Sequence, residues 1–287
     1  MKYALFLGCT IPARTLDYEL SARKVLTALG VETVDLDFGC CGFPIEAVDE
    51  EKALALAANN LSLAENNGLD ILTLCNACTE MLSKMQLALE DEKRLTGVNK
   101  VLKDRLGREY SGTVKVRHLA RFLYEEYGVE NIKKQVSRPL TGLKIAVHYG
   151  CHYMRPSRIY GEFDDPEFPK SLDLLVEATG AESIDHPNKM SCCGGGILNI
   201  DESVAVEMAK MKLGSLSSRD VDALLLICPF CGIMYSRYQR LIMKESKEIP
   251  VIYYPQLLGL ALGLSPDELG FQRNIADVSG LLGKVVK

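Results

Sequence analysis

The sequence predicts an α/β fold that consists of two tandem repeats of strand–helix units, each with a mainly parallel sheet. Short apolar runs alternate with amphipathic segments along the 287 residues, and the same order of segments and cysteines occurs twice. Such alternation is typical of parallel sheets whose strands are joined by helices. An apolar content of 47% is sufficient for a sizeable core.

The first repeat is expected over residues 1–129. Its apolar runs are short and bounded, as in buried strands, and its helices have apolar residues three and four positions apart. The expected elements are, in order, a strand over 3–7, a helix over 18–29, a strand over 31–38, a helix through Leu54, Ala57, Leu61 and Ala64, a strand over 70–74, a strand over 113–118 and a helix over 119–127.

The second repeat is expected over residues 143–287, after a polar linker over 130–142 that contains Pro139. Its expected elements are a strand over 143–148, a helix over 171–179, a strand over 181–186, a helix through Val204, Met208 and Met211, a strand over 222–227, a strand over 249–254 and a helix over 257–262. An internal repeat is the economical explanation of this agreement.

The ten cysteines form two sets of five that follow one template: a cysteine after a glycine, then Cys-Cys-Gly, then Cys-x-x-Cys. The two sets are Cys9, Cys40, Cys41, Cys75 and Cys78, and Cys151, Cys192, Cys193, Cys228 and Cys231. Most of these cysteines follow an expected strand, and ligands of parallel sheets collect at the carboxyl ends of the strands. We therefore expect five sulfurs to converge at one edge of each repeat.

Five converging thiols favour an iron–sulfur cluster in each repeat. Soft thiolates select zinc or iron–sulfur clusters, but zinc takes four tetrahedral ligands, and adjacent cysteines are awkward ligands for one small ion. A thioredoxin-like dithiol would account for Cys75 and Cys78 and leave the other three cysteines of the set without a role. Zinc sites and dithiol chemistry are the alternatives.

Two Cys-Cys-Gly motifs, each with an upstream cysteine and a downstream Cys-x-x-Cys, resemble the cysteine-rich CCG domain family. Two complete copies with little else are similar to the B subunits of the heterodisulfide reductases of methanogens, which reduce the mixed disulfide of coenzyme M and coenzyme B. The resemblance covers essentially the whole chain, and all ten motif cysteines are present.

The resemblance implies an oxidoreductase that acts on a disulfide and belongs to a complex of several subunits. Each five-cysteine set would hold one noncubane [4Fe-4S] cluster, and the heterodisulfide would lie between the two clusters and be cleaved in one-electron steps. Electrons would arrive from the iron–sulfur C subunit, which is supplied by the flavin-containing A subunit. The sequence itself has no ferredoxin-type cysteine run and no Gly-x-Gly-x-x-Gly dinucleotide motif.

Three rival functions are consistent with the same residues. A CCG-domain redox protein can act on another thiol or disulfide, or on a quinone. A pure electron-transfer subunit would carry clusters that never contact a substrate. A zinc-stabilised binding or scaffold protein would contain zinc and no redox centre.

Four charged or titratable residues near the cysteines are weaker candidates. Arg14, Arg155 and Lys189 are candidates for binding the anionic groups of a substrate, because each lies on an expected loop near a cysteine. His152 follows Cys151, where the first repeat has Thr10, and is a candidate proton donor. Their ordinary alternatives are solvated loop charges and, for His152, a hydrogen-bond donor to cluster sulfur.

Charge and hydropathy exclude other classes of function. A net charge of −5 without a basic cluster argues against nucleic acid. The longest apolar runs are far shorter than the ~20 residues that cross a bilayer, and no cleavage site follows the first apolar run. A cytoplasmic protein without membrane insertion is therefore expected.

Overall fold

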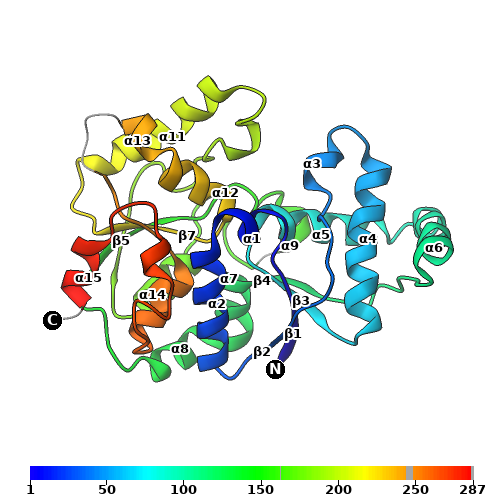
Figure 1. Ribbon diagram of the computed structural model, residues 1–287, viewed down its shortest axis with the longest axis horizontal. Coiled ribbons are helices and arrows are strands. Elements are labelled where there is room, and N and C mark those ends of the chain that lie inside the picture. The colour runs from blue at the N-terminus through cyan, green and yellow to red at the C-terminus, as the bar shows by residue number, and fades with distance from the viewer. Residues whose placement is uncertain (162, 244–247, 286–287) are drawn as a thin grey trace.

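The computed structural model describes residues 1–161, 163–243 and 248–285. It contains one four-stranded sheet in each half of the chain (Figure 1), with strand orders β2-β1-β3-β4 and β6-β5-β7-β8. All six pairings between neighbouring strands are parallel. The strands are β1 (Lys2–Phe6), β2 (Glu32–Val34), β3 (Asp70–Thr73), β4 (Val116–His118), β5 (Lys144–His148), β6 (Glu182–Ile184), β7 (Ala223–Leu226) and β8 (Val251–Tyr253). The predicted α/β fold with two tandem parallel units is confirmed.

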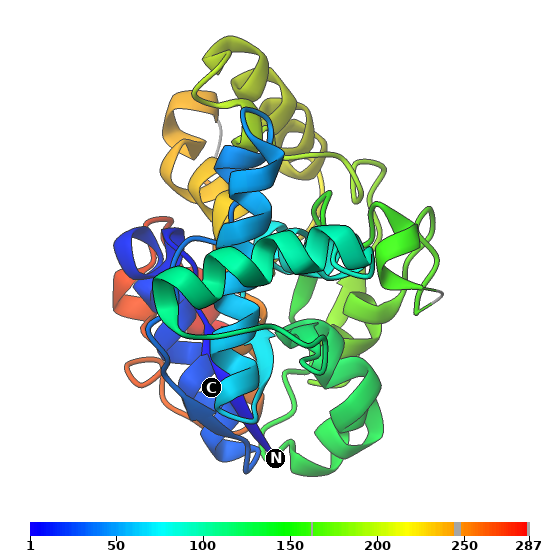
Figure 2. The same ribbon diagram turned by 90° about the vertical axis from the view of Figure 1, so that its right-hand side faces the viewer.

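Helices connect the strands in both halves. Those of the first half are α1 (Thr10–Arg14), α2 (Leu16–Ala28), α3 (Phe43–Glu46), α4 (Glu50–Asn66), α5 (Asn76–Ala88), α6 (Glu92–Leu106), α7 (Leu119–Phe122), the π-helix η1 (Leu123–Gly128) and α8 (Val129–Gln135). Figure 2 shows α6 lying across α4 on the outside of this half.

The second half has shorter helices around its sheet. They are α9 (Ser157–Tyr160), α10 (Ser171–Glu177), the 3₁₀ turn η2 (Gly195–Ile197), α11 (Glu202–Ser217), α12 (Pro229–Gly232), the π-helix η3 (Ile233–Arg237), α13 (Gln239–Met243), α14 (Tyr254–Ala261), the 3₁₀ turn η4 (Phe271–Arg273) and α15 (Ser279–Val285). Among the residues described here, no helix combines the length and the apolar character that a bilayer crossing requires.

The strand order places the first and third strands of each sheet side by side at the centre. Phe6 at the end of β1 lies opposite Thr73 at the end of β3, and His148 at the end of β5 lies opposite Leu226 at the end of β7. The chain leaves these two strands toward opposite edges of the sheet, and ligands of open α/β sheets bind at such a reversal point. Both sheets therefore direct the loops after their central strands to one place.

The two halves pack against each other through a shared apolar core. Helix α2 lies against α14 (Figure 1), and the rings of Tyr18 and Tyr253 stack with their centroids 4.1 Å apart. The Tyr18 hydroxyl donates to the carbonyl oxygen of Ile227 at 3.1 Å, and the imidazole of His118 bonds the same oxygen through Nε2 at 3.0 Å. Two residues of the first half thus hold the backbone that immediately precedes Cys228.

The segment between the halves differs from the predicted polar linker. Helices α7, η1 and α8 follow one another directly, so residues 129–135 are helical. Gly128, at φ +90°, separates α8 from the preceding π-helix, and the buried side chain of Ile132 packs α8 against the core. Beyond the helix, the backbone N–H groups of Ser137 and Arg138 donate to the carbonyl of Ala261. The boundaries 1–129, 130–142 and 143–287 stay a prediction about domains.

Candidate metal centre

The five cysteines of the second set surround one cavity of about 280 Å³. Cys151 follows β5, the pair Cys192-Cys193 precedes η2, and Cys228 and Cys231 flank the first turn of α12. Three residues of the first half, Phe43, Asn76 and Ala77, complete the wall. The sulfurs of this set converge as the strand ends suggest, and their assignment as metal ligands stays a prediction.

The first set surrounds a much smaller crevice of about 10 Å³. The cysteines that line it are Cys9, Cys41, Cys75 and Cys78. The fifth, Cys40, is half-buried, and its sulfur accepts a hydrogen bond from the Gly42 N–H at 3.4 Å. This crevice is thus much smaller than the cavity beside the second set.

Two phenylalanines separate the cysteine sets. Phe43 follows the first Cys-Cys-Gly and Phe230 lies inside the second Cys-x-x-Cys; both line the cavity and the crevice, with ring centroids 6.5 Å apart. Gly195 and Ala77 stand at the equivalent positions of the opposite halves. Each half therefore supplies one aromatic wall to the boundary between the sets.

The two sets meet at Cys75 and Cys228, which are both buried. A hydrogen bond between the two thiols raises the pKa of Cys75, whereas hydrogen bonds from Cys231 and then from Cys75 lower the pKa of Cys228. Each of these cysteines is the N-cap residue of a helix, α5 or α12. The free N–H groups and the dipole of a helix N-terminus favour the thiolate, which is the form that binds metal.

The pKa values of the two cysteines of the second pair shift in opposite directions, because the contact with Cys192 raises the pKa of Cys193 to about 12, whereas that of Cys192 is lowered. The Cys192 sulfur lies 3.8 Å from that of Cys151, and the pKa of Cys192 is lowered first by this contact and then by Cys193. The N–H groups of Gly194 and Gly195 donate to the sulfurs of Cys192 and Cys193, each at 3.4 Å. These hydrogen bonds stabilise negative charge on sulfur before any metal is considered.

The glycine of each Cys-Cys-Gly motif is required by backbone geometry. Gly42 and Gly194 have φ values of +99° and +80°, and a Cβ on either would lie 2.8 Å from the carbonyl oxygen of Ala53 or 2.7 Å from that of Ala205. Only glycine takes this left-handed conformation without a side-chain clash. The turn therefore presses each cysteine pair against the helix that follows, α4 or α11.

Among the four weaker candidates, His152 is the one that lines the cavity. Its ring meets that of Phe43 edge-to-face at 5.1 Å, and its Nδ1 lies 3.7 Å from Oε2 of Glu80 on α5. Glu80 is buried, and burial raises the pKa of its carboxyl. His152 therefore has an acidic partner behind it and the cysteine cavity in front of it.

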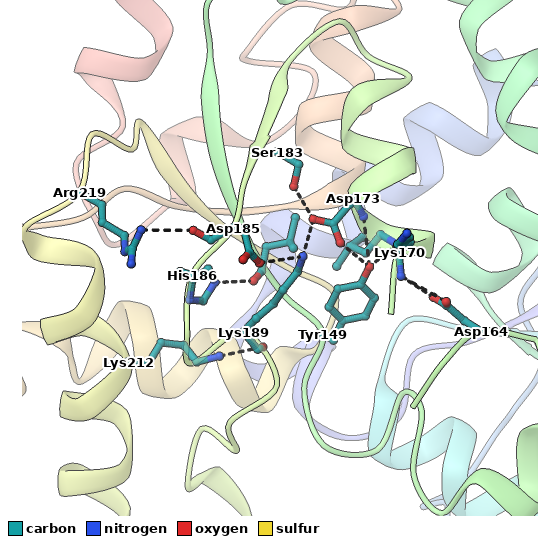
Figure 3. Close-up of polar contacts among 12 residues, drawn as sticks. Tyr149, Asp164, Lys170, Asp173, Ser183, Asp185, His186, Lys189, Lys212 and Arg219 are labelled. Atoms are coloured by element: carbon teal, nitrogen blue, oxygen red, sulfur yellow. Dashed lines mark hydrogen bonds and ion pairs between the residues drawn. The ribbon is translucent and has the colours of Figure 1, made fainter. Parts of the chain in front are cut away.

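Lys189 lies outside the cavity lining. Figure 3 shows its ammonium between two carboxylates, 2.7 Å from Asp173 and 3.6 Å from Asp185. Asp173 also accepts hydrogen bonds from Tyr149 Oη and Ser183 Oγ. This ammonium is already neutralised, so the structure gives no support to its prediction as an anion contact.

The two arginine candidates also lie away from the cavity lining. Arg155 is exposed and donates to the carbonyl of Pro166 at 3.1 Å and to Glu167 at 3.3 Å. Arg14 lines a separate small crevice together with Arg237 and Arg273. Their roles as substrate contacts stay predictions.

A buried pair behind the second set was not identified from the sequence as functional. His148 at the end of β5 places its Nε2 3.1 Å from the sulfur of Cys231, and its Nδ1 lies 2.5 Å from Nζ of Lys212 on α11. The ligand atoms of His148, Cys193 and Cys231 all lie within 4.8 Å of one another. The signal was a lysine on the buried side of a helix, where charged residues are rare.

The residues around the cavity fit a thiolate-bound inorganic group. Ten free cysteines gather at one place without forming a disulfide. Two buried polar atoms beside them, Asn76 Oδ1 and Tyr235 Oη, have no hydrogen-bond partner within the described part of the chain. Buried polar atoms normally have partners, and such orphans at a soft-ligand site are consistent with a group that completes it.

Comparisons with known proteins agree with this chemistry. The CCG cysteine-rich domain family matches residues 3–83 and 145–236. A protein of Methanosarcina acetivorans, named as the B subunit of a ferredoxin/F420H2-dependent CoB-CoM heterodisulfide reductase, is 41% identical and covers 99% of this chain and 97% of its own. A protein of Wolinella succinogenes named 8-methylmenaquinol:fumarate reductase membrane anchor subunit is 31% identical and covers 98% and 99%.

A solved structure supports the fold. A hypothetical protein from Helicobacter pylori superimposes with a TM-score of 0.77 and 16% identity, over 97% of this chain and 52% of its own. The family model matches both halves, and the relatives match over the full length, so together they identify the family to which the ten-cysteine template belongs. The chain belongs to the CCG cysteine-rich domain family of iron–sulfur oxidoreductases, among the relatives of the heterodisulfide reductase B subunits.

Proposed function

We propose that this chain is the catalytic B subunit of a heterodisulfide reductase, which reduces the mixed disulfide of coenzyme M and coenzyme B to the two thiols. The observation that carries the proposal is that the two cysteine sets line neighbouring spaces that share the walls Phe43, Ala77 and Phe230, with the larger cavity on the second set. Full-length similarity to proteins named for this activity supports it.

The cysteines would hold the redox groups. Cys9, Cys40, Cys41, Cys75 and Cys78 would bind one noncubane [4Fe-4S] cluster, and the second set would bind the other. Two such clusters supply one electron each, and the disulfide takes up two electrons and two protons as its S–S bond becomes two thiols. The cysteines would bind these groups as thiolates, and backbone N–H groups already donate to the sulfurs of Cys40, Cys192 and Cys193.

The remaining residues would position the substrate and deliver a proton. Phe43 and Phe230 form apolar walls that exclude water from the reacting sulfurs. His152 faces the cavity and has Glu80 as its acidic partner, so it is placed to hold a proton for a product thiolate. Electrons would come from a flavin-containing A subunit through an iron–sulfur C subunit.

The first experiment is an assay of iron, acid-labile sulfide and zinc on anaerobically purified protein. Two tetranuclear clusters predict about eight irons per chain. EPR spectra would then be compared after addition of coenzyme M or of ethanesulfonate, which has the sulfonate but lacks the thiol. A change with coenzyme M alone supports the proposal, whereas zinc without iron contradicts it.

A quinone-linked redox subunit is the second candidate. It is favoured by the full-length similarity to the Wolinella protein, whose name refers to 8-methylmenaquinol. Clusters that respond to a menaquinol analogue and not to coenzyme M would support this function instead. The same purified protein serves for both measurements.

A further inference from the structure

The buried pair Lys212–His148 has no function in the proposal above. Both side chains are almost completely buried, with 0% and 1% of their surface exposed. Lys212 Nζ also lies 3.0 Å from the carbonyl oxygen of Lys189, as Figure 3 shows. A buried ammonium is unfavourable unless it is paired. The burial of Lys212 therefore indicates a negatively charged group nearby that stabilises its positive charge.

The hydrogen bonds fix the direction in which His148 donates. In its ammonium form, which only donates, Lys212 Nζ donates to Nδ1 of His148 and to the Lys189 carbonyl. Nδ1 therefore carries no hydrogen, and the neutral imidazole has its hydrogen on Nε2. Burial lowers the pKa of His148 well below its usual value, which agrees with a neutral ring. The Nε2–H group points at the sulfur of Cys231, 3.1 Å away.

With Lys212 charged, the same tautomer makes His148 a donor to a cysteine sulfur and not a metal ligand. Nδ1 uses its lone pair to accept from Lys212, and Nε2 carries the hydrogen that is donated to Cys231. Neither ring nitrogen has a free lone pair, although His148, Cys193 and Cys231 are close enough to share an ion. The imidazole is a donor to a ligand sulfur, which is the usual role of a residue around a metal site.

The first half has no such pair. Phe6 stands at the end of β1 where His148 stands at the end of β5. Asn60 of α4 corresponds to Lys212 of α11, because each stands at the same interval from the aspartate that caps its helix. Asn60 accepts from the Gly39 N–H and donates to the Cys40 carbonyl, both at 2.9 Å. Both residues anchor the loop before a cysteine pair, but only Lys212 brings a charge.

Charge and hydrogen bonds at the sulfurs set the potential of an iron–sulfur cluster. Reduction adds a negative charge, which a donor to a ligand sulfur and a nearby cation both stabilise. Burial lowers the pKa of Lys212 to about 7, and the nearby sulfurs of Cys231, Cys193 and Cys192 oppose this shift and favour the ammonium. The other charged groups nearby are Lys189, with its partners Asp173 and Asp185, and His186, whose burial lowers its pKa to about 4.

We propose that Lys212 and His148 are positioning residues that make the two cysteine sets electronically unequal, so that a cluster held by the second set accepts an electron at a higher potential than one held by the first. The inference rests on the proposed clusters. Lys212 and His148 would then set the order in which the two clusters are reduced, although both ligand sets consist of five cysteines.

The test is an anaerobic redox titration of the complete protein, followed by EPR. Lys212→Met removes the charge and the donor to Nδ1, and it should lower the reduced-to-oxidised ratio of one cluster about tenfold at a fixed potential, which is 59 mV for one electron. The other cluster should not change. Lys210→Met is the matched control, because Lys210 lies on the same helix but is exposed and paired with Glu207.

Further variants keep the result decisive. Lys212→Gln retains a donor without charge and should give a smaller shift, which covers the case in which Lys212→Met does not fold. His148→Phe, which copies the first half, should keep full iron content and lower the same potential. The shift should persist in Cys41→Ala, which identifies the second set as its source.

Three outcomes overturn the inference. Equal shifts of both clusters, or no shift with full iron content, would show that the pair does not distinguish the sets. Loss of iron in His148→Phe would show that the imidazole is a ligand and not a donor. Wild-type protein without iron would overturn the proposed function as well, and this result is separate from the other two.

Discussion

The two halves share a sheet order and a cysteine template, yet the side chains around their sulfurs differ. The second set borders a cavity of about 280 Å³ and has a buried lysine and histidine behind it. The first set borders a crevice of about 10 Å³ and has Asn60 and Phe6 at the corresponding places. The repeat therefore determines the positions of the cysteines. The residues that differ between the halves determine the volume of the space and the charge beside each cysteine set.

The halves also differ in the side-chain hydrogen bonds that they make to the backbone of the other half. Asn76 in the first Cys-x-x-Cys donates through Nδ2 to the carbonyl of Tyr149 at 2.8 Å, while the equivalent Pro229 has no side-chain donor. Tyr18 and His118 of the first half both bond the carbonyl of Ile227. The first half thus contributes polar side chains that fix the cysteine loops of the second.

The largest expected effect comes from removing one cysteine of either pair. Cys41→Ala and Cys193→Ala should each reduce iron from about eight to about four atoms per chain and abolish nearly all disulfide reduction, because each change removes a ligand of one cluster. Iron analysis and EPR measure the effect. An active variant with full iron content would show that the ligand assignment is wrong.

A smaller effect is expected at the glycines of the two motifs. Gly194→Ala introduces a Cβ 2.7 Å from the Ala205 carbonyl oxygen at φ +80°, so the free energy of unfolding should fall by about 2–4 kcal/mol. Gly42→Ala should behave in the same way, because its surroundings repeat those of Gly194. Chemical denaturation of the complete protein measures both.

A glycine within α11, the helix against which Gly194 packs, provides the control for this comparison. Gly214 lies on α11, where a Cβ would meet nothing within 4 Å. Gly214→Ala should leave the free energy of unfolding unchanged or raise it by up to about 1 kcal/mol, because alanine favours helix. Equal losses for Gly214→Ala and Gly194→Ala would contradict the role given to the left-handed turn.

The smallest effect concerns His118 at the boundary between the halves. Its Nδ1 accepts from the Ala120 N–H and its Nε2 bonds the Ile227 carbonyl, so the folded site holds a neutral ring. Burial lowers its pKa from 6.5 to about 4. The unfolded chain therefore binds one more proton between these values, and stability falls as the pH is lowered from 6.5 toward 4.

His118→Gln should remove this proton uptake and keep a donor for Ile227. Between pH 7.5 and pH 5.5, the variant should lose about 1.4 kcal/mol less stability than the wild type, which corresponds to one proton over the unit below pH 6.5. Anaerobic denaturation at the two pH values checks this difference. Identical losses in the two proteins would show that His118 does not carry the pH dependence.

The fold was largely predictable because most elements occur twice in the sequence, so the pattern of one half supports the prediction for the other. All eight strands were predicted, since short apolar runs recur in both halves, although several are shorter than expected, such as β2 over Glu32–Val34 within the run 31–38. The role of the cysteines as ligands stays a prediction. The structure places a separate helix over Val129–Gln135, which begins after Gly128 and buries Ile132, in a segment whose composition is polar.

Only those parts of the site that follow from motif spacing could be predicted from the sequence, and the buried Lys212 was not among them. The expected face of α11 ran through Val204 and Met211, but these are 46% and 65% exposed. The buried face passes instead through Ala205, Ala209, Lys212 and Leu216. A lysine in that series was hidden because the sequence pattern favours the alternative apolar stripe.

The placement of the two phenylalanines has a consequence for how each site is closed. Phe43 of one half and Phe230 of the other border both sulfur-lined spaces, so neither half closes its own site. A chain with a single copy of the repeat would have to pair with a second copy of itself to shield its sulfurs from water and oxygen. With both copies in one chain, this closure does not depend on protein concentration, and the two surfaces can carry different residues.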